Sequence, residues 1–162
     1  MIRDATINDA AEICAIYNYY IENTIISFEE IPLSAADMQK RIETVQSYNL
    51  PWLVYSDNDA IAGYAYATRW HSRASYKYSV ESSAYLKHGM IGNGIGSSLY
   101  ADLIDRLKTL KYHVVIGGIA LPNPGSVALH EKFGFHQVAH YRETGFKNGR
   151  WIDVGYWELI LE

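Results

Sequence analysis

Glycine occupies every second position from 92 to 96 in the middle of the chain, at Gly92, Gly94 and Gly96. A ligand can come close to the backbone at glycine, because glycine has no Cβ. The residues before this segment read as a strand and those after it as a helix. Free amide hydrogens and the helix dipole converge on such a turn and bind anions. The segment therefore predicts a site for a phosphorylated ligand.

The spacing of the glycines argues against two common phosphate-binding motifs. A dinucleotide-binding turn follows G-x-G-x-x-G, and its third glycine position falls here on Ser97 or Leu99. A P-loop ends in G-K-[ST], but the segment contains no lysine. A plain tight turn that binds nothing remains the structural alternative.

Hydrophobic periodicity predicts the elements that position this turn. Ser34 and Asp37 form a capping box that starts a second helix, after a first helix capped by Thr6 or Asn8. Two further helices follow the glycines and Pro122. The order mixes hairpins with crossover helices, which predicts one α/β or α+β domain over residues 1–162 with a mixed sheet. The expected strands are residues 2–6, 52–56, 60–70, 76–86 at the centre, 112–121, 134–141 and 151–161.

Length and composition exclude several classes of protein. The chain has 162 residues, 49% of them hydrophobic and 20% charged, as expected for one ordinary globular domain. A net charge of −4 without a basic run makes nucleic acid an unexpected partner. No segment has the length of a membrane span or the pattern of a signal peptide, and Cys14 is the only cysteine. We therefore expect a cytoplasmic protein with no membrane partner.

The segment "IGNGIG", residues 91–96, resembles the pyrophosphate loop of the GNAT superfamily of N-acetyltransferases, [Q/R]-x-x-G-x-G/A. Ile91 departs from this motif, because it stands where the motif has Gln or Arg. The resemblance implies a GNAT fold with a largely antiparallel sheet flanked by helices, acetyl-CoA as co-substrate, no metal, and a homodimer. It extends to "LPNPGSVALHEKFGF" and, for the phosphinothricin acetyltransferase branch, to "SFEEIP", "RWHSRASYKYSVESSAYL" and "GFKNGRWIDVGYWEL".

Acetyl transfer to an amine needs a base that deprotonates the ammonium and benefits from an acid that protonates the leaving thiolate. The resemblance implies that Glu81, in the strand 76–86, is the base. His130 stands where many superfamily members have a tyrosine acid. Each has a structural alternative: Glu81 as a solvated edge carboxylate, and His130 as a core histidine on one helix stripe with Val127 and Phe133.

The resemblance also implies which residues bind acetyl-CoA. The backbone at the end of the central strand would pair with the pantetheine amides, and the loop amides would hold the pyrophosphate. Asn123 matches a cofactor-contacting asparagine, although it could equally cap the following helix. The residues expected to bind the cofactor are Ala84, Tyr85, Leu86, Gly92, Asn93, Gly94, Ile95, Gly96, Ser97 and Asn123.

Phe28, Arg73 and Tyr76 match positions that line the amino-acid site of the phosphinothricin branch. Arg73 could pair with a carboxylate or phosphinate through two hydrogen bonds. His136 and His140 are four residues apart, but they lie in an expected strand, where this spacing does not indicate a metal site.

These residues together predict an N-acetyltransferase that acts by direct attack on the α-amine of a small amino acid or an analogue. Phosphinothricin, methionine sulfone and methionine sulfoximine are the expected types of acceptor. Another amine, such as a polyamine, an antibiotic or a protein terminus, is the alternative within the same class. An acyl-CoA-binding sensor and a nucleotide-binding module are the alternatives from other classes.

Overall fold

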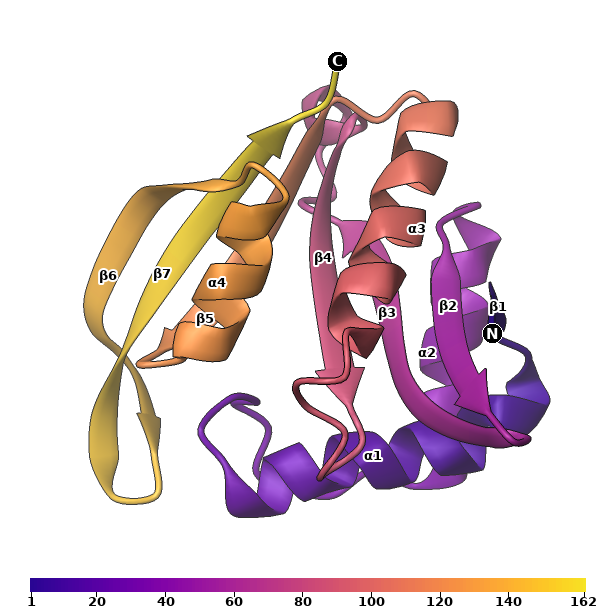
Figure 1. The fold of residues 1–162 in the computed structure, drawn as a ribbon. Helices are drawn as coiled ribbons and strands as arrows, with labels where there is room; N and C mark the ends of the chain where they lie inside the picture. The colour runs from indigo at the N-terminus through magenta and orange to yellow at the C-terminus, as the bar shows by residue number, and fades with distance from the viewer.

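Seven strands form one sheet in the order β1-β2-β3-β4-β5-β7-β6 in the computed structural model, which describes residues 1–162 (Figure 1). Only β4 and β5 run parallel, and every other neighbouring pair is antiparallel. The expected mixed, largely antiparallel sheet is therefore confirmed, with the strand that holds Glu81 at its centre. The strands are β1 Ile2–Asp4, β2 Trp52–Asp57, β3 Ala60–Arg69, β4 Ser79–Leu86, β5 Val114–Leu121, β6 His136–Lys147 and β7 Arg150–Ile160.

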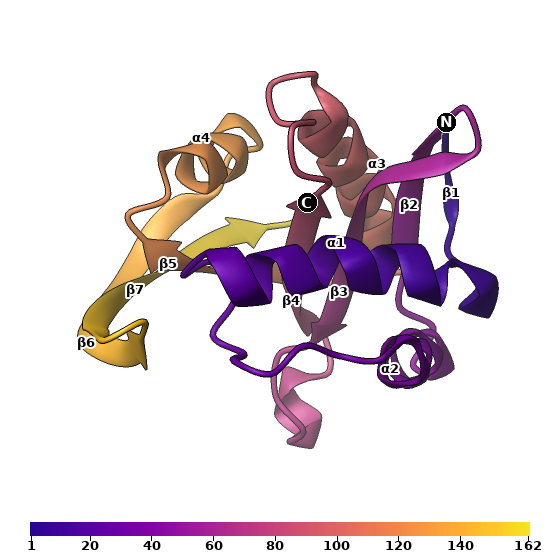
Figure 2. The same ribbon diagram turned by 90° about the horizontal axis from the view of Figure 1, so that it is seen from below.

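Helices cover both faces of the sheet. Figure 2 shows α1 and α2 on one side of the strands and α3 and α4 on the other. The helices are α1 Ala10–Asn23, α2 Ala35–Ser47, α3 Ile95–Thr109 and α4 Pro124–Lys132, with short 3-10 turns at Ile7–Asp9 and Ala74–Tyr76. Their buried apolar stripes pack on the sheet, and the fully buried side chains include Ile13, Ile42, Leu99 and Leu103.

Two of the local signals in the sequence act as expected, whereas the N-cap of α1 is Asp9 rather than Thr6 or Asn8, because Thr6 starts the 3-10 turn Ile7–Asp9 that precedes the helix. Ser34 Oγ accepts from the amide of Asp37, and the Asp37 carboxylate accepts from the amide of Ser34, so the predicted capping box starts α2. Asn58 and Asp59 both have positive φ and form the tight turn between β2 and β3.

Two expected strand boundaries differ from the structure by three residues or more, and the others by at most two. The central strand begins at Ser79 rather than at Tyr76, because residues 74–76 form a 3-10 turn. β6 continues to Lys147 rather than ending near residue 141, and pairs with β7 as a long hairpin. A register shift between Tyr141 and Gly145, where Glu143 has a positive φ, interrupts the alternation from which a strand is predicted.

β4 and β5 separate soon after they begin to pair. Their register covers only residues 79–81 of β4 and 114–116 of β5. β3 continues along the other edge of β4 as far as the pair Gly63 and Leu86. The β5 side of residues 82–86 is therefore without a strand partner, and the sheet opens at this point.

Candidate active site

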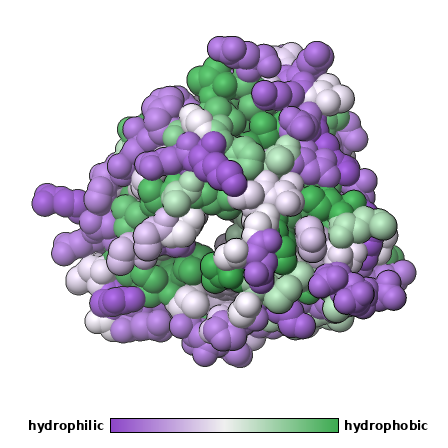
Figure 3. Space-filling view, in the orientation of Figure 1, coloured by the Kyte–Doolittle hydropathy of each residue, from purple (hydrophilic) through white to green (hydrophobic).

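Two hollows meet where β4 and β5 separate. Figure 3 shows the surface opened between α4 and β4 in the orientation of Figure 1. The first hollow is a slot of about 60 Å³ between the separated strands, and it includes Ser82, Ala84, Asn123 and His130. The second is a cavity of about 670 Å³ on the α1 side, which we call the acceptor cavity. The two hollows share the lining residues Ile26, Tyr85, Gly118 and Ala120.

Glu81 reaches the acceptor cavity from β4, together with Tyr156 from β7. Its Oε1 lies 3.2 Å from the point that a Cβ on Gly118 would occupy, so the absence of a side chain there makes room for the carboxylate. Burial raises the pKa of Glu81 above the usual range of a glutamate. The carboxylate takes part in none of the hydrogen bonds or ion pairs of the protein, which leaves it free to accept a proton.

His130 projects from α4 on the opposite face of the sheet and is only 4% exposed. Its Nδ1 lies 2.7 Å from the carbonyl oxygen of Ser126, so Nδ1 carries the hydrogen. Nε2 then accepts from the Tyr100 hydroxyl at 3.0 Å, and the Tyr100 hydroxyl is 3.2 Å from Ser82 Oγ. Burial lowers the pKa of His130, which favours the neutral ring. This geometry favours the core alternative for His130 over a charged acid.

The glycine turn leads into the N-terminus of α3. Gly94 is the N-cap residue, with φ of 77°, and it provides no side chain to accept from the first amides of the helix. The first helical bond runs from the amide of Ser98 to the carbonyl oxygen of Gly94. Nothing lies within 4 Å of the Cβ positions of Gly92 and Gly94, so the turn borders open space. The free amides at this turn can bind an anion, and the unpaired edge of β4 beside the slot offers backbone groups to an extended chain.

Two side chains near the turn bear on the charge of this site. Ile91 is 71% exposed and contributes no polar group. Lys132, at the end of α4, donates to Ser97 Oγ at 2.9 Å and brings a cation to the first turn of α3. Asn123 lines the slot, and its Oδ1 accepts from the amide of Ser126 at 3.1 Å, so it also caps α4.

The residues expected at the acceptor site are only partly brought together. Phe28 lines the acceptor cavity with Glu81. Arg73 and Tyr76 lie on the exposed loop 70–78 and do not line the cavity. Trp70, at the start of the loop, packs its ring against Tyr156 of the cavity wall, with centroids 5.7 Å apart.

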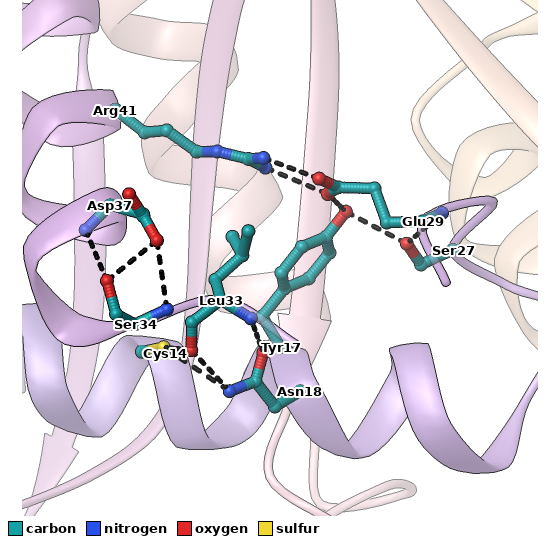
Figure 4. A network of polar contacts seen from close by, with 9 residues as sticks. All are labelled: Cys14, Tyr17, Asn18, Ser27, Glu29, Leu33, Ser34, Asp37 and Arg41. Atoms are coloured by element: carbon teal, nitrogen blue, oxygen red, sulfur yellow. Dashed lines mark hydrogen bonds and ion pairs between the residues drawn. The ribbon is translucent and has the colours of Figure 1, made fainter. Parts of the chain in front are cut away.

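A polar network next to the cavity was not predicted from the sequence (Figure 4). Arg41 of α2 donates two hydrogen bonds to Glu29, one of them 2.8 Å long, and Tyr17 of α1 also donates to Glu29. The Tyr17 hydroxyl is 2.9 Å from Ser27 Oγ. The Arg41 guanidinium lowers the pKa of Glu29, so this carboxylate is charged at neutral pH. The segment "SFEEIP" contains Glu29, but nothing local to it indicates the partners on two separate helices.

No cluster of three or more His, Cys, Asp or Glu side chains is arranged to hold a metal ion. His140, one of the two spaced histidines, instead pairs with Asp153 at 2.7 Å. Among the helices, none combines the length and apolar character needed to span a membrane.

A family model described as "Acetyltransferase (GNAT) domain" matches residues 2–155. The phosphinothricin N-acetyltransferase of Streptomyces viridochromogenes is 38% identical over 161 residues, which are 99% of this chain and 87% of that protein. The L-methionine sulfoximine/L-methionine sulfone acetyltransferase of Pseudomonas aeruginosa is 33% identical, over 99% of this chain and 94% of that protein.

Solved structures agree with these matches. A phosphinothricin acetyltransferase from Sinorhizobium meliloti in complex with acetyl-CoA has a TM-score of 0.97 and 36% identity, and covers 99% of this chain and 88% of its own. The protein yncA of Salmonella typhimurium, solved with its cofactor acetyl-CoA, has a TM-score of 0.97 at 32% identity and covers 100% of this chain and 94% of its own.

The divided sheet and the free amides of α3 define an acyl-CoA-dependent transferase fold. The chain belongs to the GNAT acetyltransferase family. It is an acetyl-CoA-dependent N-acetyltransferase, and the resemblance of its sequence to that family is confirmed.

Proposed function

We propose that this enzyme transfers the acetyl group of acetyl-CoA to the α-amine of a small amino acid or an analogue such as phosphinothricin, methionine sulfone or methionine sulfoximine. The named activities of relatives with 33–38% identity support this class of acceptor. The observation that carries the proposal is the partly buried, unpaired carboxylate of Glu81 in the acceptor cavity. It lies beside Gly118, and Gly118 borders both the acceptor cavity and the slot.

Glu81 acts in this proposal as the general base. An amine with a pKa near 10 is almost fully protonated at neutral pH and cannot attack a carbonyl carbon in that form. A carboxylate whose pKa is raised by burial accepts the proton more readily, directly or through one water molecule. The nitrogen then attacks the thioester carbon directly, the carbon–sulfur bond breaks, and no acyl-enzyme forms.

The two hollows support a reaction in which both substrates are bound together. The thioester end of acetyl-CoA would lie at the slot, with the pantetheine amides on the backbone of Ala84, Tyr85 and Leu86 and the pyrophosphate on the amides of residues 92–97. Backbone amides freed by the separation of β4 and β5 could also polarise the thioester carbonyl. The acceptor enters from the other face, where Glu81 and Phe28 lie.

His130 would serve this reaction by orienting the Tyr100 hydroxyl, since its own Nε2 is an acceptor in the neutral ring. The Tyr100 hydroxyl gives its one hydrogen to His130 Nε2 and can accept from Ser82, so the Ser82 hydroxyl, which also borders the slot, is the donor available to a leaving sulfur. A role for His130 as the acid would require it to bind a second proton in a buried position.

Arg73 and Tyr76 would bind the acceptor's acidic group only if their loop reached the acceptor cavity. Either the loop moves or a second copy of the chain provides it in the homodimer that the resemblance implies. The cavity needs a cation for such a group, because no lysine or arginine lines it.

A cationic amine such as a polyamine is a second candidate for the acceptor. The lining of the cavity includes two carboxylates, Glu29 and Glu81, and the first of these is already paired with Arg41. These carboxylates would attract a second ammonium group on the acceptor.

A free-thiol assay with acetyl-CoA distinguishes these acceptors. The panel contains phosphinothricin, methionine sulfone, methionine sulfoximine, a polyamine, an aminoglycoside and a peptide with a free N-terminus. The proposal expects kcat/KM to be highest for one of the first three compounds. Preference for the polyamine would favour the second candidate, and release of thiol with none of the six would overturn both.

A further inference from the structure

Lys147 is the least exposed of the charged residues in the protein. It lies at the end of β6 and is only 3% exposed. Its Nζ forms no ion pair. It donates instead to two backbone carbonyl oxygens, those of Ile21 at 2.8 Å and Ser27 at 2.6 Å. Burial of an ammonium is costly unless hydrogen bonds satisfy it, so these two bonds account for its position.

The two carbonyls belong to the end of α1 and to the loop that follows it. Ile21 lies in the last turn of α1, where carbonyl oxygens have no amide of the helix to accept from, and a cation is favoured there by the helix dipole. Ser27 lies in the loop 24–33. A single side chain, more than 100 residues further along the chain, therefore joins the helix end to the loop.

The same loop and the same hairpin both line the acceptor cavity. The loop contributes Ile26, Ser27, Phe28 and Glu29, and β6 contributes Tyr141 and Thr144. Figure 1 shows the end of α1 and the loop beside the lower part of the β6–β7 hairpin. The position of the loop against the hairpin therefore shapes the space available to an acceptor.

A second contact joins the loop to the hairpin close to Lys147. The Phe28 ring packs directly on the backbone of Gly145, where a Cβ would lie 2.4 Å from a ring carbon. The opposite side of the loop is held separately, by the Glu29–Arg41 pair and by two hydrogen bonds of 2.9 Å between Asn18 and Leu33 (Figure 4). The contacts of Lys147 and Gly145 therefore connect the loop to the hairpin.

We propose that Lys147 is a positioning residue that holds the loop 24–33 against the β6–β7 hairpin and thereby sets the affinity for the acceptor. This role rests on the proposed function, because it assigns the acceptor to this cavity. Lys147 touches neither the slot nor the pyrophosphate turn, and Ile26 is the one residue of the loop that borders the slot, so the effect of Lys147 falls mainly on the acceptor. Gly145 assists by leaving room for Phe28.

The test compares Lys147→Met with Arg150→Met. Arg150 pairs with Lys147 across the hairpin but is exposed, so its replacement removes the same charge without touching the loop. We expect Lys147→Met to increase hydrogen exchange of the amides in residues 24–33 and to raise the acceptor KM at least about fivefold. The KM for acetyl-CoA should change less than about twofold. Arg150→Met should leave both measurements as in the unchanged enzyme.

Two further variants make the result decisive. Lys147→Arg retains donors for both carbonyls and should restore most of the acceptor affinity. Gly145→Ala displaces Phe28 without altering any charge and should raise the acceptor KM in the same way, which also covers the case that Lys147→Met fails to fold. Unchanged exchange and unchanged acceptor KM in the soluble variants, or equal increases in both KM values, would overturn the proposal.

The exchange measurement needs no substrate. If no amine in the panel is acetylated, the proposed function fails, but faster exchange in Lys147→Met still supports the fastening of the loop. Unchanged hydrogen exchange in residues 24–33 would show that Lys147 does not hold the loop, whichever amine is the acceptor.

Discussion

The Glu81 carboxylate and the His130 imidazole lie on opposite faces of the sheet, each against one of two adjacent glycines in β5. Glu81 Oε1 is 3.2 Å from the Cβ position of Gly118, and His130 Nε2 is 2.3 Å from that of Gly117. Successive residues of a strand point to opposite faces, so this glycine pair makes room for a polar side chain on each side. The arrangement puts the proposed base on the acceptor side and the Tyr100–His130 pair on the α4 side.

Replacement of Glu81 by Gln should remove the base and keep the shape of the cavity. We expect kcat to fall about 10²- to 10⁴-fold at neutral pH. The dissociation constant of acetyl-CoA, measured by calorimetry, should stay the same, because Glu81 lines the acceptor cavity and not the slot. Turnover equal to that of the unchanged enzyme would exclude Glu81 as the base.

The raised pKa of Glu81 predicts two dependences on pH. As a base, Glu81 must be ionised, so kcat/KM should rise with pH through a value above the ordinary glutamate pKa of about 4.3. A carboxyl whose pKa is higher in the folded state destabilises the fold above its unfolded pKa. Glu81→Gln should therefore raise Tm at pH 7 and lose this advantage at pH 4. A Tm increase of the same size at both values would contradict burial as the cause.

The two glycines of β5 should respond differently to a methyl group. Gly118→Ala would push against Glu81 and Tyr156 at the edge of a cavity, so kcat should fall at least about tenfold with a small change in Tm. The methyl group of Gly117→Ala would clash with the buried His130 ring, so we expect mainly a decrease of about 1 to 3 kcal/mol in the free energy of unfolding. Gly125→Ala, whose Cβ would meet nothing closer than 3.9 Å, is the control for both kinetics and thermal unfolding.

Lys132 should contribute charge to the binding of acetyl-CoA. Lys132→Met should raise the KM for acetyl-CoA about fivefold at low salt, and less at high salt, while leaving the acceptor KM unchanged. Lys108→Met, at the far end of α3, is the matched control. Addition of Ile91→Arg to the Lys132 variant should restore affinity by returning a cation to the exposed turn. An equal effect of the Lys108 change would mean that only the net charge matters.

Arg73→Ala tests the proposed partner of the acceptor's acidic group. The acceptor KM should rise more than about tenfold, the typical effect of losing a charge-assisted hydrogen bond, and the KM for acetyl-CoA should hardly change. Lys77→Ala removes a charge from the same loop and is the control. Equal effects on both KM values would remove Arg73 from the acceptor site. Kinetics repeated over a range of enzyme concentrations would test whether a second copy provides the residue.

Features that depend on neighbouring residues could be read from the sequence. The capping box at Ser34, the turn at Asn58 and the glycine turn before α3 each depend on the conformation of a few adjacent residues. Apolar runs, β-favouring residues and turn residues likewise located all seven strands, because these signals also depend on residues close together in the chain. The boundary errors at Tyr76 and in β6 came where a 3-10 turn and a bulge interrupt these patterns.

The contacts that shape the site could not be read in this way, because they join residues that are far apart in the chain. Glu81 meets Gly118 only because β4 and β5 run parallel for three residues and then separate. Lys147 reaches Ser27 across 120 residues, and nothing in the neighbourhood of either one indicates the other. Strand order and register decide such pairs, and both follow from the packing of the whole sheet rather than from local preferences.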